Sequence, residues 1–325
     1  MDRDPGTTDR WSLVTYGTGD DGTEHVGILR ADSGVCGVPE LSEYQGLMPA
    51  IEHWPEVSAI LKNRDPQLYE PIPGARILAP LRYPGKILCA GANYWSHLRE
   101  MGGTVDDGAL DDPFFFLLPG TAIVGPDEPI EIPIDGDARV DWEGELAVVI
   151  GQAGRKISVE RAPAHVAGYT ICNDVSARGL HQRPSYSAPP FEWDWLASKG
   201  RDTFLPLGPG VTPSWLVDDP HDLPLRVWVN GSLKQDGRTS DLIVDIWQLI
   251  AAASTIVTLE PGDVITTGTP AGVGAPRGEF LRLGDVVTVE IEPLGRLSNP
   301  VRVEREAPIV VETVVPTSNP DPTGV

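Results

Sequence analysis

The segment Val140-Asp-Trp-Glu-Gly-Glu-Leu-Ala-Val-Val-Ile150 is the most informative stretch of the chain. Its second half is apolar and rich in β-branched residues, which predicts a buried strand. Its first half carries Asp141, Glu143 and Glu145 at a spacing of two residues. Because side chains alternate across a strand, we expect these three carboxylates to lie on one face. Carboxylates so close repel one another, so the segment indicates either a hard divalent cation among them or a solvated strand end.

The composition limits the classes of protein to which the chain can belong. Its 325 residues suffice for one large domain, or for a large domain with a small one, and 35 Gly with 32 Pro favour short strands and turns over a helix bundle. A net charge of −22 argues against nucleic-acid binding and against docking on anionic membranes. No apolar run reaches the length of a membrane span and the start lacks a signal-peptide pattern, so we expect a cytoplasmic protein. The three cysteines are far apart and are predicted to be core residues in a reducing compartment.

The opening residues, 1–75, are predicted to form a small, separate, β-rich N-terminal domain. Residues 11–30 contain Gly-Asp and Asp-Gly pairs between loosely alternating apolar residues, which indicates a hairpin. Residues 49–62 carry apolar side chains at helical spacing, which predicts one amphipathic helix. No residue pattern in this part of the chain suggests chemistry.

Short apolar segments separated by Pro and Gly dominate the larger domain predicted over 76–303. Phe114–Leu118 is predicted to be a buried strand and residues 286–291 the final strand, while residues 245–257 form the clearest helical pattern. The strands outnumber the helices without a βαβ repeat, which indicates the α+β class. Residues 304–325 are predicted to be a Pro-rich, extended tail.

Gly91-Ala-Asn-Tyr-Trp-Ser-His-Leu-Arg-Glu-Met-Gly102 predicts a short helix with glycine at both ends, suited to a lid that orders over a ligand. His97 and Glu100 are three residues apart, so they lie side by side on one helical turn. Such a pair is either a proton-transfer dyad or a solvated surface pair, and the spacing alone favours the surface pair.

Asp174 follows the apolar residues 168–172, which places it at the end of a strand. That position suits a further cation ligand, although Asp174 with Ser176 could instead form a helix N-cap pair. Arg178, four residues further on, could bind a substrate carboxylate or carbonyl. The aromatic residues 184–196 predict a loop near a pocket mouth or an interface, and Lys199 follows them.

Residues 264–274 predict a strand that runs into a Gly-rich turn. The turn lacks the Gly-Lys-Ser/Thr sequence and the following helix of a phosphate loop, so we exclude nucleotide binding. It offers close backbone approach and the hydroxyl group of Thr269.

Together these segments resemble the fumarylacetoacetate hydrolase family. The resemblance runs from about Ile77 to Val301, and the opening module resembles the variable N-terminal domain of bacterial members. The segments that carry it are Gly91–Gly102, Asp-Trp-Glu-Gly-Glu-Leu-Ala-Val-Val-Ile-Gly (141–151), Asn-Asp-Val-Ser-Ala-Arg (173–178), Lys199 with Asp-Thr-Phe-Leu-Pro-Leu-Gly-Pro (202–209), and Thr-Thr-Gly-Thr-Pro-Ala-Gly-Val-Gly (266–274).

The resemblance implies a mixed β-sandwich or roll of the family's C-terminal type, usually as a homodimer. It implies bound Mg²⁺ or Mn²⁺, for which Ca²⁺ can substitute, and by motif position the metal ligands are Glu143, Glu145 and Asp174. His97 and Glu100 fall on the family's dyad, and Lys199 on the lysine near the metal and the developing oxyanion. The residues predicted to bind substrate are Tyr94, Arg178, His181 and Thr269.

The activity that the resemblance implies is metal-dependent hydrolysis of a C–C bond in a 1,3-dicarbonyl or acylpyruvate-like compound, through a metal-stabilised enolate. The alternatives are a lyase or isomerase that decarboxylates, tautomerises, hydrates or dehydrates a 2-oxo or enol acid, and a non-catalytic homologue. In each case the predicted partner is a small oxo-acid or diketone.

The chain departs from the family pattern at three places near the expected pocket. Leu118 stands where many members have the lysine of Phe-x-Lys-Pro. Gly179 and His181 replace the Asp and Gln of Arg-Asp-x-Gln, and the insertion over 186–195 is longer than usual. These changes predict a bulkier or more apolar, less anionic substrate than a small oxo-diacid.

Overall fold

The computed structural model describes residues 10–19, 22–103, 112–134 and 136–304. The tail predicted over 304–325 therefore lies almost wholly outside the described residues. Among the described residues, no helix is long and apolar enough to cross a membrane.

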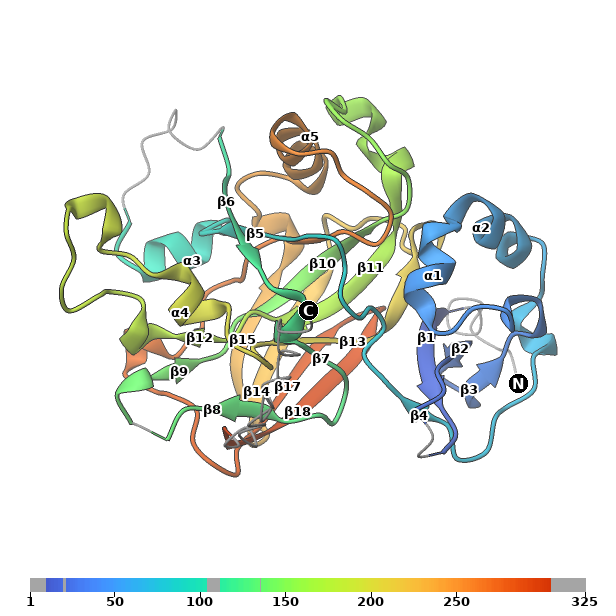
Figure 1. Cartoon of the computed structure of the whole chain (residues 1–325), viewed down its shortest axis with the longest axis horizontal. Coiled ribbons are helices and arrows are strands. Elements are labelled where there is room, and N and C mark those ends of the chain that lie inside the picture. The colour runs from blue at the N-terminus through green and yellow to red at the C-terminus, as the bar shows by residue number, and fades with distance from the viewer. Residues whose placement is uncertain (1–9, 20–21, 104–111, 135, 305–325) are drawn as a thin grey trace, which may run out of the picture.

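Most strands of the described chain belong to one extended sheet, called the long sheet below (Figure 1). Neighbouring strands along its main path are antiparallel except β16 and β5. In spatial order the strands are β3 (Gly34–Gly37), β2 (His25–Arg30), β1 (Trp11–Gly17), β13 (Leu205–Pro213), β11 (Val166–Asn173), β10 (Gly144–Ile150), β16 (Val264–Thr266), β5 (Ile87–Gly91) and β6 (Phe114–Leu118), with β4 (Arg76–Ile77) beside β1 and β7 (Ile123–Val124) beside β13.

A second sheet packs against one face of the long sheet: β14 contacts β10, β17 contacts β11 and β18 contacts β13. Its strands in spatial order are β15 (Ser232–Arg238), β14 (Pro224–Val229), β17 (Val286–Ile291), β18 (Gly295–Val303) and β8 (Ile130–Ile132). The short strands β9 (Val140–Asp141) and β12 (Ser176–Ala177) pair with each other. Two packed sheets with separate helices confirm the α+β prediction.

Strand β10 is buried on both faces because each face meets a different hydrophobic core. Leu146 and Val148 lie in the core between the two sheets, whereas Ala147 and Val149 lie in the core on the opposite face. Both sets are fully buried, which explains the continuous apolar run in the sequence. The alternation also directs Glu143 and Glu145 away from the second sheet, because they share the parity of Ala147 and Val149.

The helices are short, and the predicted single helix over residues 49–62 is two helices. Helix α1 ends at Glu52 and α2 begins at Trp54, because Pro55 has no N–H to continue the ladder of hydrogen bonds. The predicted helix over 245–257 is confirmed, and Asp245 with Gln248 forms a capping box at its start. The helices are α1 (Leu47–Glu52), α2 (Trp54–Lys62), α3 (Trp95–Glu100), α4 (Trp195–Lys199) and α5 (Ile246–Ile256).

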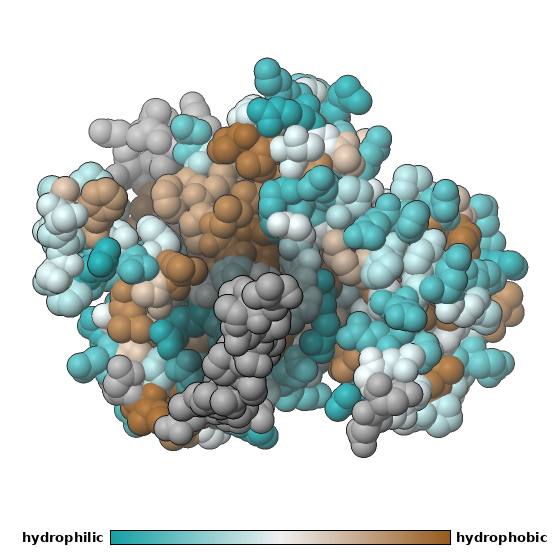
Figure 2. Space-filling model, viewed as in Figure 1, coloured by the Kyte–Doolittle hydropathy of each residue, from teal (hydrophilic) through white to brown (hydrophobic). Residues whose placement is uncertain are grey.

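The N-terminal residues form the predicted hairpin of β1 and β2, and in Figure 1 they lie to one side of the larger part of the molecule. Strand β1 also pairs with β13, at Leu13 and Val211, and both residues belong to one hydrophobic core. Trp54 stacks on Trp215, with ring centroids 5.6 Å apart. The domain boundary at residue 75 stays a prediction. Figure 2 shows a mainly hydrophilic surface on this N-terminal part, with more apolar residues near the centre of the molecule.

Two expectations about strands were wrong. Strand β6 is the edge strand of the long sheet, so Phe114 and Leu117 are 51% and 60% exposed instead of buried. Strand β17 is not the last strand, because the chain turns at Glu292–Leu294 and continues as β18 along it. The buried residues Leu297, Asn299 and Val301 alternate along β18, which is the signal that could have predicted it.

Candidate active site and metal centre

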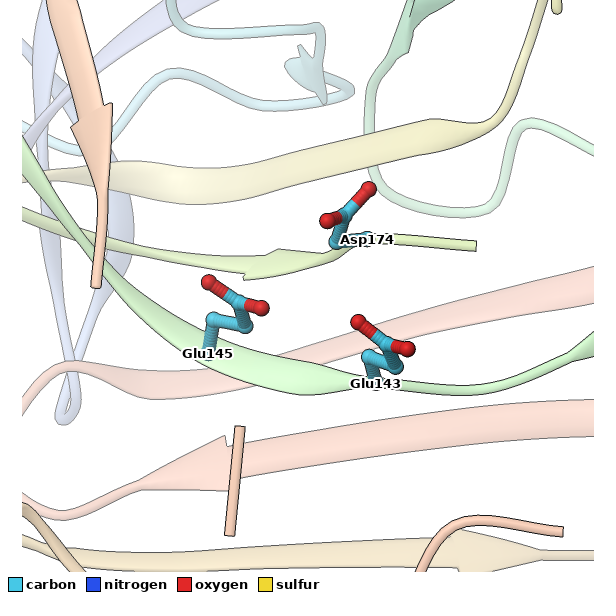
Figure 3. A group of neighbouring side chains, drawn as sticks. All are labelled: Glu143, Glu145 and Asp174. Carbon is cyan, nitrogen blue, oxygen red and sulfur yellow. The ribbon is translucent and has the colours of Figure 1, made fainter. Parts of the chain in front are cut away.

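Three buried carboxylates meet where β10 begins and β11 ends (Figure 3). Glu143 directly precedes β10, Glu145 lies within it, and Asp174 follows β11. The antiparallel pairing of Gly144 with Asn173 brings these positions together. One oxygen from each carboxylate lies within 4.8 Å of the others, and each of the three residues is 5% exposed or less. The structure thus brings together the three predicted metal ligands.

Asp141, which the strand pattern placed on the same face, is not part of this cluster. The expected alternation holds, because Val140 and Trp142 lie in the same hydrophobic core as Leu146, so Asp141 points to the same face as Glu143 and Glu145. The Asp141 carboxylate instead accepts hydrogen bonds from the backbone N–H groups of Gly274 and Ala275, at 2.6 and 3.0 Å, and from Arg178 Nε at 3.0 Å.

Two cationic side chains contact the cluster, the buried Lys199 and the mostly buried Arg178. Lys199 Nζ donates to Glu143 Oε2 at 2.8 Å and to Asp174 Oδ2 at 2.6 Å. Arg178 Nη2 donates to Glu143 Oε1, so it joins Glu143 to Asp141. The alternative N-cap pair of Asp174 and Ser176 is excluded, because Ser176 lies in β12 and its hydroxyl donates to Glu143 Oε1.

The electrostatics of the cluster suit a divalent cation. Burial raises the pKa of Asp174 to about 6 and raises that of Glu145 well above its usual range. Burial also acts on Glu143, but the adjacent Lys199 and Arg178 cations hold its pKa at about 2. With every group ionised, four carboxylates including Asp141 face two cations, which leaves a charge of two minus. Asp174 Oδ1 is buried without a hydrogen-bond partner among the described residues, as an oxygen ligand awaiting an ion would be.

We expect the metal affinity and the metal-dependent stability to increase with pH. The raised pKa values of Glu145 and Asp174 mean that protons stabilise the folded metal-free protein, so this stability falls as pH rises through about 6. A divalent cation displaces those protons, so it binds more tightly at high pH. The increase in Tm on adding Mg²⁺ should therefore be larger at pH 8 than at pH 5.5, as measured by calorimetry. An equal or smaller increase at pH 8 would contradict the assignment.

A cavity of about 360 Å³ lies over the cluster. It brings together the predicted residues His97, Arg178, His181, Lys199 and Thr269 with the three acids. Thr269 Oγ1 donates to the carbonyl of Gly144 at 2.8 Å, and Tyr94 is fully buried but is not among the described residues that line the cavity. The lining residues are Ala90, Gly91, Ala92, His97, Met101, Phe116, Glu143, Glu145, Asp174, Arg178, His181, Trp193, Trp195, Lys199, Gly268 and Thr269.

One wall of the cavity is aromatic. The Trp195 ring stacks on Phe116 with centroids 4.9 Å apart and meets the edge of His181 at 4.3 Å. Trp193 lies 5.1 Å from His181, centroid to centroid. The sequence analysis named Leu118 as one of the residues that would make the pocket more apolar. Leu118 is instead buried in a hydrophobic core and does not line the cavity. Phe116, Trp193 and Trp195 provide the apolar surface instead.

His97, on α3, lines the cavity with the acidic cluster, whereas Glu100 is beside it and is not among the described residues that line the cavity; both side chains are mostly buried. His97 Nδ1 lies 3.7 Å from Glu100 Oε2, and the side chains are 9% and 16% exposed. Both carboxylate oxygens of Glu100 accept from the backbone N–H of Gly272, at 3.1 and 2.9 Å. Burial lowers the pKa of His97, so its imidazole is neutral at pH 7. The solvated surface pair that the spacing favoured is therefore excluded.

Backbone N–H groups of the Gly-rich turn after β16 donate hydrogen bonds to the acidic residues. The sequence had predicted only that the backbone of this turn can approach other groups closely. The N–H of Gly268 donates to Glu145 Oε2 at 2.7 Å, while those of Gly272 and Gly274 donate to Glu100 and Asp141. Sequence reasoning did not identify Asn173 as a further contact: its Oδ1 accepts from the backbone N–H of Glu143 at 2.8 Å. Its place directly before Asp174 at a strand end was the available signal.

Comparison with known proteins shows which family this chain resembles. The model of the fumarylacetoacetate hydrolase C-terminal region matches residues 86–302. A mitochondrial oxaloacetate tautomerase of Xenopus laevis is 45% identical over 227 residues, which are 69% of this chain and 68% of that protein.

Solved structures agree with this match. A fumarylacetoacetate hydrolase from Exiguobacterium antarcticum aligns with a TM-score of 0.76 and 33% identity, over 90% of this chain and 100% of the other. A maleylpyruvate hydrolase from Sphingobium sp. SYK-6, solved with manganese(II) and pyruvate, aligns with a TM-score of 0.72 and 27% identity over the same shares. The family match and the shared fold confirm the resemblance found in the sequence, and the chain belongs to the fumarylacetoacetate hydrolase family.

Proposed function

We propose that this protein is a divalent-cation-dependent enzyme that interconverts the keto and enol forms of a small 2-oxo acid. The observation that carries the proposal is the position of His97, which lines the same cavity as the three-carboxylate cluster and lies beside Glu100. Related proteins act on small oxo-acids, and the Xenopus relative, at 45% identity, is an oxaloacetate tautomerase. This relative favours tautomerisation over the C–C hydrolysis that the sequence placed first.

The protein's own groups account for recognition and proton movement. Glu143, Glu145 and Asp174 would hold the cation. When bound, the cation supplies Lewis acidity to the carboxylate and keto oxygens of a 2-oxo acid. The positive charge of Lys199 at the cavity wall favours an anionic substrate and the negative charge that develops on an enolate.

Proton transfer falls to His97. Its neutral imidazole accepts a proton from the carbon next to the substrate carbonyl and returns it to the same carbon or to the oxygen. Glu100 stabilises the imidazolium while its own position is fixed by Gly272 N–H. This shuttle interconverts keto and enol forms without a change in atom count.

Hydrolysis of a C–C bond is the second candidate, and the maleylpyruvate hydrolase structure favours it. In that reaction the same imidazole takes a proton from a water molecule, whose oxygen adds to the carbon of a second carbonyl. The C–C bond next to that carbon then breaks, and the fragment that leaves as an enolate takes the proton back from the imidazolium. The two reactions share the metal cluster and the dyad and differ in whether water enters.

Product analysis separates the two candidates. Oxaloacetate, acylpyruvates and bulkier β-diketones are incubated with Mg²⁺ and the protein, while the enol absorbance is followed and the products are identified by mass spectrometry. Faster equilibration of enol with keto oxaloacetate, without new fragments, supports the tautomerase. Two-fragment products from an acylpyruvate support the hydrolase. If neither the enol absorbance nor the products differ from those of a heat-inactivated control, both candidates are contradicted.

We expect His97→Ala to lower kcat by about 10²–10⁴-fold, because general acid–base catalysis contributes that much. Binding of Mn²⁺ should change little, since His97 is outside the three-carboxylate cluster. His53→Ala, in the N-terminal part, is the matched control and should retain full activity. A His97→Ala enzyme with unchanged kcat would contradict the dyad and favour the non-catalytic homologue.

The finer assignments stay predictions from the sequence and from the family resemblance. They are Mg²⁺ as the physiological cation, a homodimeric assembly, a cytoplasmic location and the role of Tyr94 in substrate binding. Metal titration, light scattering, cell fractionation and Tyr94→Phe kinetics test them in turn.

A further inference from the structure

Strand β15 of the second sheet contains a polar side chain that is completely buried, Gln235, although the residues on either side are exposed or half-buried. A buried amide is costly unless its hydrogen-bonding groups are paired, so its partners show what it does there. All of its partners belong to the segments that form the metal centre.

Gln235 joins the residue between two predicted metal ligands to the Gly-rich turn. Its Oε1 accepts from the N–H of Gly144 at 3.0 Å. Its Nε2 donates to Thr269 Oγ1 at 2.8 Å and to the carbonyl of Pro270 at 2.7 Å. Thr269 Oγ1 in turn donates to the carbonyl of Gly144 at 2.8 Å. These bonds close a ring that holds the N–H and the carbonyl of Gly144 at once.

We propose that Gln235 is a positioning residue for the cation site, which it sets by fixing the two peptide groups of Gly144. One of these groups is bonded to Glu143 and the other to Glu145, so their orientation sets the direction of both carboxylates. Strand β16 pairs with β10 only from Ala147 to Val149, so it does not reach Gly144. At Gly144, beyond the end of that ladder, the hydrogen bonds from β10 go to the side chains of Gln235 and Thr269. The proposal rests on the proposed function only in requiring that a cation binds.

The packing around Gly144 shows why its position depends on the second sheet. A Cβ atom at residue 144 would lie 2.4 Å from Val227 Cγ2 and 3.0 Å from Val289 Cγ1, so the backbone of β10 is pressed against β14 and β17. The turn is pressed against β15 in the same way: Gly272 has φ +113°, and a Cβ there would lie 2.2 Å from the carbonyl of Lys234. Gln235 lies between these two contacts.

The same ring extends to the dyad, because the turn that Gln235 holds also carries Gly268 and Gly272. Their N–H groups donate to Glu145 and Glu100, respectively. A shift of the turn would therefore move a metal ligand and the carboxylate that faces His97 together.

The test is direct binding of Mn²⁺ to full-length variants, measured by electron paramagnetic resonance and by calorimetric titration in the absence of substrate. Gln235→Met keeps the volume but removes the ring of hydrogen bonds. We expect its Kd for Mn²⁺ to rise about 10–100-fold, the usual effect of losing a residue that orients metal ligands. Gln235→Asn, which is one methylene too short to join both partners, is expected to weaken binding in the same direction and provides a milder variant should Gln235→Met not fold.

Asn299→Leu is the matched control. Asn299 is buried in the same sheet, and its Nδ2 donates to the carbonyls of Gly125 and Glu128, away from the cluster. We expect it to lower the Tm like the Gln235 variants while leaving the Kd for Mn²⁺ unchanged.

The outcomes distinguish this inference from the proposed function. The inference is supported if the wild-type protein binds Mn²⁺, both Gln235 variants have a higher Kd, and Asn299→Leu keeps the wild-type Kd. Wild-type binding with an unchanged Kd in a folded Gln235 variant overturns the inference alone, as does an equal loss of affinity in Asn299→Leu. No binding of Mn²⁺ by the wild-type protein overturns the inference and the proposed function together.

Discussion

Glu145→Gln is expected to abolish divalent-cation binding and to lower turnover by at least about a thousandfold, because the several kcal/mol of charge stabilisation supplied by the cation are lost. The same substitution should raise the Tm of the metal-free protein at pH 8. Burial raises the pKa of Glu145, so its charged form is destabilising there, and a neutral amide removes that repulsion. Its oxygen can still accept from the N–H of Gly268.

Glu143→Gln provides the contrast for this prediction. Lys199 and Arg178 hold the pKa of Glu143 at about 2, so its charged form stabilises the fold above pH 4 and that stability is lost only as pH falls toward 2. Its replacement should lower the Tm at pH 8 while also abolishing cation binding. Calorimetry with EDTA, together with turnover at saturating Mg²⁺, measures both effects. Retention of turnover by Glu145→Gln would contradict the metal site, and Tm shifts of the same sign in both variants would contradict the charge assignment.

Lys199→Met is expected to destabilise the metal-free protein by about 3–5 kcal/mol at pH 8, the usual cost of removing one partner from a buried ion pair. Lys199 is 4% exposed and contacts both Glu143 and Asp174, so its loss leaves two buried carboxylates without their cation. The adjacent carboxylates raise the pKa of Lys199, so its charge stabilises the fold across the whole range from pH 5 to 8.

The pH dependence identifies the cause of this loss. Once Lys199 is gone, protonation of Asp174 and Glu143 relieves their repulsion, so the loss should be smaller at pH 5.5 than at pH 8. Urea unfolding in EDTA at both pH values measures it. Arg238→Met is the control, since its ion pair with Asp222 is about half exposed and should contribute at most about 1 kcal/mol. A Lys199→Met protein as stable as wild type would contradict the role of the buried charge.

Features that depend on neighbouring residues could be predicted from the sequence. The apolar run of β10, the helical spacing of α5 and the strand end at Asp174 are all found where local patterns placed them. The family motifs then selected Glu143, Glu145 and Asp174, which the fold brings together.

Features that depend on distant segments could not be predicted in this way. The strand pattern placed Asp141 beside Glu143 and Glu145, but it could not show that the Gly-rich turn, more than a hundred residues later, binds the Asp141 carboxylate. His97 and Glu100 resembled a surface pair because nothing in the sequence of their own helix shows that the backbone of Gly272 packs there and donates a hydrogen bond to Glu100. The exposure of Phe114 depends on β6 being an edge strand, which a single strand's sequence does not reveal.

The acidic side and the aromatic side of the cavity come from parts of the fold that differ in how many neighbouring strands fix them. The acidic cluster lies at the ends of β10 and β11, which are paired on both sides within the long sheet. The aromatic wall comes from the edge strand β6 and from the segment that carries His181, Trp193 and Trp195. Substitutions in the wall can therefore alter substrate preference while the three carboxylates keep their geometry, which makes this scaffold readily evolvable and marks the wall as the place to begin when redesigning specificity.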